Sequence, residues 1–492
     1  MTTQPLLCVT VTAPTTAALR EARDRAEHAD LVELRLDSVS DPDVAGALAG
    51  RQRPVILTCR AAWEGGAFKG SEDERRRFLE QAIEQGAEFV DIEWQARFED
   101  LIARTQGRRI VLSSHDFASM PVDLPERARA MRSTGAEVIK IAAKANRLTD
   151  CLALLDVKTS TSPRERSILI AMGEAGLITR VFAGRFGSAW TYAGHLRALN
   201  QVSAELMLDQ YRFRSIDPET ALYGLAGSPI EHSVSPAMHN AAFVATGCNA
   251  VYLPFPAADA GDFATFARAV GVKGASVTIP FKVSLLDHVD DVDQRAREIG
   301  ALNTIRMDTD GWQGRNTDAD GFLRPLDDRG VALAGCRASI LGAGGSARAI
   351  AVALASRKAS VTVHARDRGR AERVAALASG TAGDFPPARG AWDLLVNCTP
   401  IGMHPHIDRT PVPVEALRGG LVYDLVYNPE VTRLLRDAST AGCQTIGGLD
   451  MLVAQAMEQF RWWTGIAPPA AVMRAAAKNR LSEFRADEDH VV

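Results

Sequence analysis

Short hydrophobic runs of strand length recur through the first half of the chain, and stretches with helical patterning, such as 15–28, 73–85 and 124–134, separate most of them. The strand-like runs cover residues 6–13, 31–37, 54–60, 89–94, 109–116, 137–144, 167–173 and 178–183. Regular alternation of strand and helix is typical of a parallel sheet. Eight such runs within roughly 200 residues predict a (β/α)8 barrel, and an open doubly wound sheet is the alternative.

Charged side chains interrupt these hydrophobic runs. They are Glu33, Arg35, Arg60, Glu93, His115, Lys140 and Arg180. A buried charge is unfavourable unless it is paired or used in chemistry. Several of these residues stand near the carboxyl ends of predicted strands, where the active sites of barrels lie. They therefore predict one shared site.

Lys140 lies inside a Val-Ile-Lys-Ile-Ala run, which predicts that its amine is shielded from water. A desolvated lysine can attack a carbonyl group as a neutral amine. The structural alternative is a lysine that snorkels to the surface or pairs with Glu93. Because His115 and two arginines are expected on the same rim, we favour a Schiff-base lysine with a histidine proton shuttle. The arginines suit a carboxylate substrate.

A set of short motifs in the first half resembles a known family. The motifs are Glu-Leu-Arg (33–35), Thr-Cys-Arg (58–60), Asp-Ile-Glu (91–93), Ser-Ser-His-Asp-Phe (113–117), Lys-Ile-Ala (140–142) and Phe-Gly-Ser-Ala (186–189). Over about residues 5–212 the chain resembles type I 3-dehydroquinate dehydratase. The resemblance implies that Lys140 forms an imine with the substrate ketone, that His115 transfers protons and that Glu93 orients His115. It also implies substrate-binding roles for Glu33, Arg35, Arg60, Arg180, Ser188 and Gln201.

The segment before Gln201 departs from that family. Where family members usually have a Pro-Gly turn in the lid loop, this chain has Leu199 and Asn200. Proline and glycine set the backbone preferences of a turn. The difference therefore predicts altered closure of the lid and a weaker dehydratase.

The second half begins after a polar segment, 209–220, and carries residues suited to acid–base chemistry. Ser233 and Ser235 precede a helical run, where hydroxyl groups can cap the helix or bind a carboxylate. Lys282 follows a strand that stops at Pro280, and Asp318 follows a glycine-rich turn. A lysine and an aspartate that meet in a cleft form a proton-transfer pair.

A glycine-rich loop joins a strand ending at Leu341 to a helix. Its residues are Gly342, Ala343, Gly344, Gly345, Ser346 and Ala347. In this context the loop predicts a dinucleotide pyrophosphate at the helix N-terminus. The next strand, 360–364, lacks the terminal acidic residue that holds the ribose of NAD. Arg366 and Arg370 follow it, which predicts NADP(H) and leaves Asp367 pointing to solvent. The alternative is that these arginines only solvate the start of a helix.

These features of residues 219–485 resemble shikimate dehydrogenase. Further matching motifs are Gly-Ala-Leu-Asn-Thr (300–304), Asn-Cys-Thr-Pro-Ile-Gly-Met (397–403), Asp-Leu-Val-Tyr-Asn-Pro (424–429) and Met-Leu-Val-Ala-Gln-Ala (451–456). The resemblance implies catalysis by Lys282 and Asp318. It implies substrate contacts from Ser233, Ser235, Thr278, Asn303, Tyr427 and Gln455. It implies cofactor contacts from the glycine-rich loop, the two arginines, Asn397, Thr399, Met403 and Gly448.

The order of the two halves resembles the fused bifunctional enzyme of plants and some bacteria. It implies dehydration of 3-dehydroquinate to 3-dehydroshikimate, followed by NADPH-dependent reduction to shikimate. The expected fold is α/β, with a barrel over 1–215, a substrate-binding domain over 216–323 and a Rossmann-like NADP-binding domain over 324–447. Helices in 448–492 are expected to pack back on the substrate-binding domain. A quinate- or shikimate-sensing regulator, an active dehydrogenase beside a weak dehydratase and a quinate-oxidising enzyme are the alternatives.

The composition of the chain limits the class of protein and its expected location. The 492 residues are 46% hydrophobic and 24% charged, which is typical of a globular protein. A net charge of −4 argues against recruitment by nucleic acid or an anionic membrane surface. Neither a membrane-length apolar run nor a signal peptide is visible. The seven cysteines are dispersed without a CxxC pair, so we expect a cytoplasmic protein without a metal site, and a homo-oligomer is allowed.

Overall fold

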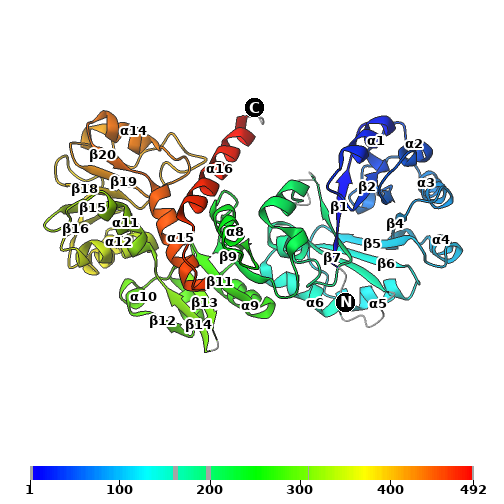
Figure 1. Ribbon diagram of the computed structural model, residues 1–492, viewed down its shortest axis with the longest axis horizontal. Helices are drawn as coiled ribbons and strands as arrows, with labels where there is room; N and C mark the ends of the chain where they lie inside the picture. Colours follow the sequence, from blue (N-terminus) through cyan, green and yellow to red (C-terminus); the bar gives the residue numbers. More distant parts are fainter. Residues whose placement is uncertain (1–3, 159–164, 195–200, 309, 490–492) are drawn as a thin grey trace. The chain divides into compact units, whose positions relative to one another are not determined.

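The computed structural model describes residues 4–158, 165–194, 201–308 and 310–489, with side chains up to residue 484 (Figure 1). Contacts within the chain divide it into two compact units. The first contains Met1–Thr220 with Phe255–Ala258, and the second contains Ala221–Pro254 with Asp259–Val492.

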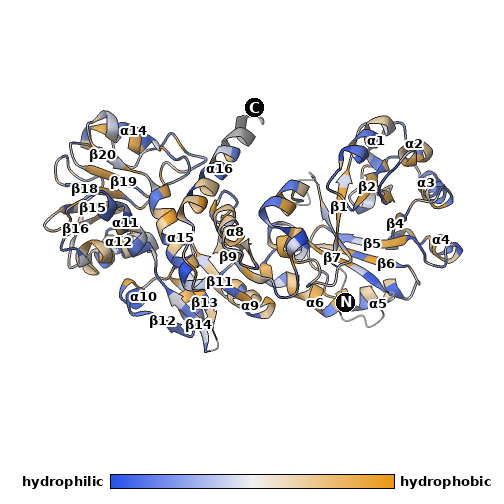
Figure 2. Cartoon of the chain, in the orientation of Figure 1, coloured by the Kyte–Doolittle hydropathy of each residue, from blue (hydrophilic) through white to orange (hydrophobic). Residues whose placement is uncertain are grey.

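The first unit is an eight-stranded parallel barrel, which confirms the predicted fold class. Its strands are β1 Leu6–Val11, β2 Leu31–Arg35, β3 Val55–Thr58, β4 Phe89–Glu93, β5 Ile110–Asp116, β6 Val138–Lys144, β7 Arg166–Met172 and β8 Trp190–Ala193, in the spatial order β7-β6-β5-β4-β3-β2-β1-β8. Its helices are α1 Thr16–Arg25, α2 Val44–Leu48, α3 Glu72–Glu84, α4 Glu99–Arg104, α5 Leu124–Arg132, α6 Ala153–Val157 and α7 Leu177–Val181. Figure 2 shows that α1 and α3 contain many hydrophilic residues.

The seam between β7 and β8 is closed by few contacts. The Ser188 hydroxyl accepts a hydrogen bond from Leu169 N at 2.9 Å and donates one to Leu169 O at 3.3 Å. The amide of Ala189 donates to Ser167 O at 2.8 Å. These contacts complete a nearly closed barrel.

The predicted position of the eighth strand is wrong. Residues 178–183 lie largely in α7, and the eighth strand is β8, twelve residues further along. Every residue of α7 is buried, including Thr179 and Arg180, so no face of the helix is exposed to solvent. A short apolar run cannot be assigned to helix or strand by periodicity alone. The buried surroundings of α7 therefore explain the error.

The second unit contains two six-stranded sheets. The first has the order β10-β9-β11-β13-β14-β12 and combines parallel with antiparallel pairs. Its strands are β9 Ala221–Gly227, β10 Ala250–Pro256, β11 Val272–Val277, β12 Asp291–Val292, β13 Thr304–Asp308 and β14 Gly311–Arg315. The helices that accompany it are α8 Ser235–Thr246, α9 Ala260–Val270 and α10 Gln294–Ile299.

The second sheet is parallel, in the order β17-β16-β15-β18-β19-β20. Its strands are β15 Arg337–Leu341, β16 Ser360–His364, β17 Thr381–Gly383, β18 Leu394–Asn397, β19 Leu421–Asp424 and β20 Gln444–Ile446, and its helices are α12 Gly345–Ser356, α13 Arg368–Ala376 and α14 Arg433–Thr440. The strand order reverses between β15 and β18, as in the Rossmann fold. The switch point brings the loop after β15 beside the loop after β18.

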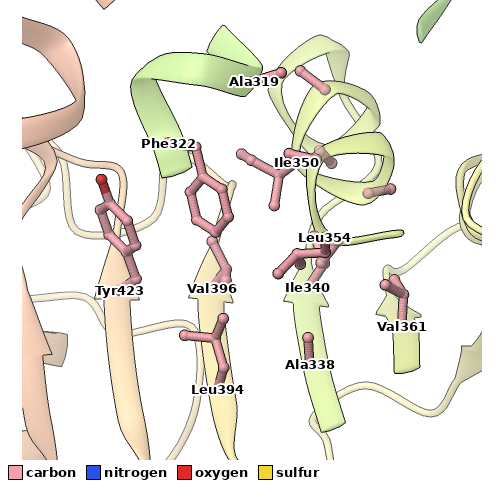
Figure 3. Close-up of a cluster of buried hydrophobic side chains, with 14 of the residues drawn as sticks. Ala319, Phe322, Ala338, Ile340, Ile350, Leu354, Val361, Leu394, Val396 and Tyr423 are labelled. Atoms are coloured by element: carbon pink, nitrogen blue, oxygen red, sulfur yellow. The ribbon is translucent and has the colours of Figure 1, made fainter. Parts of the chain in front are cut away.

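Helix α11, Asp318–Asp328, links the two sheets and crosses the expected boundary at 323–324 without a break. In Figure 3, Phe322 of α11 lies against Val396 and Tyr423, while Ile350 and Leu354 of α12 cover Ile340. The Phe322 and Tyr423 rings stack with centroids 5.0 Å apart. This core fixes the start of α11, and therefore Asp318, against the second sheet.

Helices α15, Gly448–Thr464, and α16, Ala470–Asp489, complete the second unit. Phe460 of α15 and Met473 and Leu481 of α16 share a core with Met238 and Phe243 of α8. The C-terminal helices thus pack on the part of the unit that holds the first sheet. Within the described residues, no helix has the length and apolar character needed to cross a membrane.

Two candidate active sites

The barrel holds a cavity of about 570 Å³ at the carboxyl ends of its strands. Its walls include many of the residues predicted from the sequence: Glu33, Arg35, Arg60, His115, Lys140, Arg180 and Gln201. In the register of β5 with β6, Ser113 lies opposite Lys140 and His115 lies opposite Ala142. Lys140 and His115 are thus two residues apart on adjacent strands and both line the cavity.

Lys140 is buried among carboxylates as well as apolar residues. Its Nζ lies 3.1 Å from Asp91 Oδ2 and 3.4 Å from Glu33 Oε1, and 4.4 Å from the centre of the Tyr192 ring. The lysine therefore pairs with Asp91 and Glu33, and the predicted alternative of a salt bridge to Glu93 is wrong. Burial would raise the pKa of Asp91, but Arg60 and Lys140 outweigh it and hold that pKa well below its usual range.

Glu93 binds two arginines, Arg60 and Arg75, and does not contact His115. The prediction that Glu93 orients His115 is therefore wrong. Glu93 Oε1 lies 3.0 Å from Arg60 Nη1 and accepts from the Ala61 amide at 3.2 Å, and its Oε2 pairs with Arg75. Arg60 also reaches Asp91 Oδ1 through Nη2 at 2.9 Å. Both oxygens of Glu93 are thus occupied, and Glu93 is fully buried.

Glu64 is the carboxylate that contacts His115, and the sequence analysis missed this role. Its Oε1 lies 2.8 Å from His115 Nδ1 and accepts from the His115 amide at 3.0 Å. Burial raises the pKa of Glu64 to about 8. Burial, with the charges of Arg60 and Lys140, lowers the pKa of His115. A Cβ at Gly66 would lie 2.0 Å from Arg60 O, so the turn that carries Glu64 needs glycine there to pack against Arg60. The Glu-Gly-Gly sequence at 64–66 was therefore the signal in the sequence that could have indicated this turn.

The other predicted substrate-binding residues of the barrel differ in what they present to the cavity. Arg180, on α7, is buried and donates to Tyr192 O at 3.3 Å, and burial lowers its pKa to about 10. Gln201 lines the cavity with a buried Oε1 that has no hydrogen-bond partner among the described residues. The Ser188 hydroxyl is bound to Leu169 in the barrel seam, and its predicted substrate contact stays a prediction.

Arg35 forms a bidentate pair with Asp37, with N–O distances of 2.9 and 2.8 Å. This pair fixes the guanidinium at the rim of the cavity. The lid residues Leu199 and Asn200 lie outside the described residues.

The second unit holds a cavity of about 340 Å³ between the two sheets. Predicted substrate and catalytic residues that line it are Ser233, Ser235, Thr278, Lys282, Asn303, Asp318, Tyr427 and Gln455. Ser346, Met403 and Gly448, predicted to bind cofactor, line the same cavity. The substrate and cofactor residues therefore meet in one cleft.

Lys282 and Asp318 form an ion pair in this cavity, as the sequence predicts for a proton-transfer pair. Asn303 Nδ2 donates to the other oxygen of Asp318 at 2.8 Å and to Gln455 Oε1 at 3.2 Å. Lys282 Nζ also lies 3.3 Å from Ser346 Oγ on the glycine-rich loop. The ammonium group is thus held between the aspartate and the expected cofactor loop.

A buried polar network behind this cavity was not anticipated. Ser276 Oγ accepts from the Tyr252 hydroxyl at 2.7 Å and donates to Gln459 Oε1 at 2.6 Å. Gln459 Nε2 donates to Gln455 Oε1 at 2.6 Å and to Asn303 O at 3.2 Å. These bonds orient two side chains of the predicted substrate site.

The loop after β15 fits a dinucleotide. Gly342 has a φ of +105°, and a Cβ there would lie 3.1 Å from Thr399 Cγ2. Gly344 caps α12, and a Cβ at Gly345 would lie 3.1 Å from Lys282 Cβ. Glycine thus permits a close approach of backbone at the N-terminus of a twelve-residue helix, where a pyrophosphate binds well.

Arg366 and Arg370 are exposed after β16, whereas Arg368 between them pairs with Glu372 and Asp384. Asp367 caps α13 by accepting from the Arg370 amide at 3.0 Å. The acidic residue between the arginines therefore has a helix-capping role.

Asn397 is held by neighbouring side chains, and its predicted contact with the cofactor stays a prediction. It is fully buried, donates to Asp424 at 2.9 Å and accepts from Thr399 Oγ1 at 2.7 Å. Asn397 thus shapes the turn that carries Thr399.

Comparison with known proteins places both halves. Residues 7–218 match the type I 3-dehydroquinase family, residues 225–305 match the shikimate dehydrogenase substrate binding domain, and residues 448–478 match the shikimate 5'-dehydrogenase C-terminal domain. A bifunctional 3-dehydroquinate dehydratase/shikimate dehydrogenase of Arabidopsis thaliana, named chloroplastic, is 34% identical over 90% of this chain and 78% of its own length. A shikimate dehydrogenase (NADP(+)) of Moorella thermoacetica is 43% identical over 52% of this chain and 92% of its own length.

Among solved structures, a shikimate dehydrogenase in complex with NADP+ superposes with a TM-score of 0.52 and 36% identity, covering 54% of this chain and 97% of that one. Together with the order of the two sites, these similarities show that the chain belongs to the family of bifunctional 3-dehydroquinate dehydratase/shikimate dehydrogenases.

Proposed function

We propose that this chain catalyses two consecutive reactions, the dehydration of 3-dehydroquinate in the barrel and the NADPH-dependent reduction of 3-dehydroshikimate in the second unit. The observation that carries the proposal is the presence of two complete acid–base sets in separate cavities. One contains Lys140, His115 and Glu64, and the other contains Lys282 and Asp318 beside a dinucleotide loop.

In the barrel, Lys140 as its neutral amine adds to the substrate ketone, and loss of water gives a protonated imine. His115 removes the proton from the neighbouring carbon, and the electron pair moves toward the imine nitrogen. The carbon–oxygen bond to the departing hydroxyl then breaks, and the hydroxyl leaves as water with the proton from His115. Hydrolysis of the imine releases 3-dehydroshikimate and the free lysine. Glu64 holds the His115 ring throughout.

The arginines of the barrel suit the substrate carboxylate. Arg60 and Arg180 are buried on the cavity wall, where a carboxylate gains a charge-assisted hydrogen bond in a dry site. Glu33 and the unpaired Oε1 of Gln201 provide acceptors for substrate hydroxyl groups. The different sequence at Leu199 and Asn200 favours, as a second candidate, an enzyme whose dehydratase is the weaker activity.

In the second unit, NADPH supplies a hydride to the substrate carbonyl when it is bound. Lys282 donates a proton to the carbonyl oxygen, and Asp318 holds the lysine in position. Asn303 and Gln455 are linked to the pair and bind substrate hydroxyl groups. Ser233, whose hydroxyl accepts from the Ser235 amide at 3.2 Å, and Ser235 at the start of α8 receive the carboxylate.

We propose NADP(H) rather than NAD(H), because Arg366 and Arg370 are exposed and available to a 2′-phosphate while Asp367 is engaged in capping α13. The relative of Moorella thermoacetica, which shares the dehydrogenase half, is named for NADP(+). The cytoplasmic location expected from the scattered cysteines also stays a proposal.

A coupled assay tests the whole proposal. With 3-dehydroquinate and NADPH, the wild-type chain should form an enone absorbance and then consume NADPH. Lys282→Met should accumulate 3-dehydroshikimate without consuming NADPH. Lys140→Ala should consume NADPH only when 3-dehydroshikimate is supplied. A chain that binds quinate or shikimate but turns over neither substrate would refute the proposal in favour of a sensor.

A further inference from the structure

Arg75 is a fully buried arginine that lines neither cavity. It belongs to α3, one of the helices outside the barrel strands. A buried guanidinium is unfavourable unless each part of it has a partner. The partners of Arg75 connect it to two separate walls of the dehydratase site.

The first connection runs to Arg60. Arg75 Nη1 pairs with Glu93 Oε2, while Arg60 Nη1 lies 3.0 Å from the opposite oxygen, Glu93 Oε1. Arg75 Nη1 also donates to the carbonyl of Cys59 at 3.2 Å, directly before Arg60 in the chain. Arg75 therefore restrains the backbone before Arg60 and also Glu93, the carboxylate that binds the Arg60 guanidinium. Because Arg60 continues to Asp91 at 2.9 Å, the same restraint reaches the carboxylate that pairs with Lys140.

The second connection runs to the turn that carries Glu64. On its outer side Arg75 binds Glu72, with Nη2 at 2.7 Å from Oε2. Glu72 Oε1 accepts from Trp63 Nε1 at 3.2 Å, and the Arg75 guanidinium carbon lies 5.9 Å from the centre of the Trp63 ring. Trp63 directly precedes Glu64, which contacts His115. The Arg75–Glu72 pair thus holds the turn Ala62–Glu64 from outside the cavity.

We propose that Arg75 is a positioning residue of the dehydratase, which acts through Glu93 and Cys59 on Arg60 and through Glu72 and Trp63 on the Glu64–His115 pair. This inference rests on the proposed dehydratase function. Arg75 and the partners named above all belong to the first unit, so we expect its effect on the first reaction.

Removal of Arg75 has a defined consequence for the site. Glu93 Oε2 would lose its partner, and Arg60 could then bind both oxygens of Glu93. Its guanidinium would turn from Asp91 and from the cavity wall. At the same time the Trp63 turn would lose its outer anchor, so Glu64 would hold His115 less well. The first change weakens substrate binding, and the second disturbs proton transfer.

The test compares Arg75→Met and Arg75→Lys with Arg23→Met in the full chain. Arg23 is a matched control because it is also buried, bonds the backbone carbonyls of Ala47 and Ala49 at 2.7 and 3.0 Å, and lines neither of the two cavities described above. For each variant we would measure thermal stability, dehydratase kcat, KM and pH profile, and dehydrogenase activity as an internal reference.

We expect Arg75→Met to lower dehydratase kcat/KM by roughly 100-fold, with a raised KM and a displaced pH profile, as displacement of catalytic groups does. Arg75→Lys should recover part of the loss, since an ammonium can pair with Glu93 but cannot also serve Cys59 and Glu72. Arg23→Met should lower stability while leaving KM and the pH profile unchanged. Dehydrogenase activity should stay at the wild-type level throughout.

Equal KM values and pH profiles in Arg75→Met and the wild type would overturn the inference, as would the same changes in Arg23→Met. If Arg75→Met does not fold, Glu72→Gln takes its place, because Glu72 is half-exposed and its loss weakens only the outer anchor. Glu72→Gln should displace the pH profile, and an unchanged profile would overturn the inference. A wild-type chain without dehydratase turnover would instead refute the proposed function, and with it the inference.

Discussion

Glu64→Gln separates the two tasks of this residue, holding His115 and carrying a proton. Burial raises the pKa of Glu64 from its ordinary value of 4.5 to about 8, although the charge of Arg60 acts in the opposite direction. In the folded barrel Glu64 is therefore protonated at pH 7, whereas in the unfolded chain it is ionised. Its bound proton contributes stability that is fully present below pH 4.5 and is lost as the pH rises through about 8.

The size of this contribution follows from the pKa difference. Moving a pKa from 4.5 to about 8 corresponds to about 5 kcal/mol at about 1.4 kcal/mol per pKa unit. Relaxation and water entry reduce such values, so we expect about 2–5 kcal/mol. Glutamine cannot ionise, but its oxygen still accepts from the amide of His115. The barrel of Glu64→Gln should therefore gain stability relative to the wild type as the pH rises from 5 to 9.

The assay is urea inactivation of the dehydratase at several pH values, with dehydrogenase activity of the same samples as the control. Glu64→Gln should keep substantial turnover at pH 7. Glu64→Ala should lose roughly 100-fold in kcat, since His115 then lacks its partner at 2.8 Å. Equal losses in the Gln and Ala variants, or parallel pH dependence of stability in the wild type and Glu64→Gln, would refute this reasoning.

Three further predictions concern the second unit. Lys282→Ala and Asp318→Ala should each remove most dehydrogenase activity, and the double variant should lose little more, because cooperating groups are not additive; additive losses measured by kcat would contradict a shared role. Ser233→Ala should mainly raise the KM for 3-dehydroshikimate, and an unchanged KM would exclude Ser233 from carboxylate binding. Arg366→Ala should reduce the preference of kcat/KM for NADPH over NADH by roughly 10-fold, and an unchanged ratio would argue against the phosphate contact.

The barrel was accessible from the sequence because its repeats are regular and its chemical groups sit on strands. The eighth strand could not be predicted correctly, because α7 is buried on every side and its short apolar sequence resembles that of a buried strand. The Rossmann-like sheet was signalled by the loop at Gly342 and by the strand that follows it. The continuous course of α11 was not signalled, because its start carries Asp318 while its later residues join the core of the second sheet.

The residues of the sites were easier to predict than their partners. Lys140 and His115 stand out in hydrophobic strands, whereas the carboxylates around them come from other strands and from a turn. From the sequence, Glu93 and Glu64 are equally plausible partners for His115. The folded barrel shows that Arg75 forms an ion pair with Glu93. Partner choice depends on which side chains the helices outside the barrel bring inward, and the pattern of a single strand does not contain it.

Trapping the proposed imine tests the central claim most directly. Borohydride added to the full chain together with 3-dehydroquinate should inactivate the dehydratase irreversibly. Mass spectrometry should locate the added group on Lys140, within β6, while dehydrogenase activity persists. Borohydride without substrate is the control and should leave both activities intact. Labelling of another lysine, or an unlabelled chain that keeps full dehydratase activity, would contradict the account.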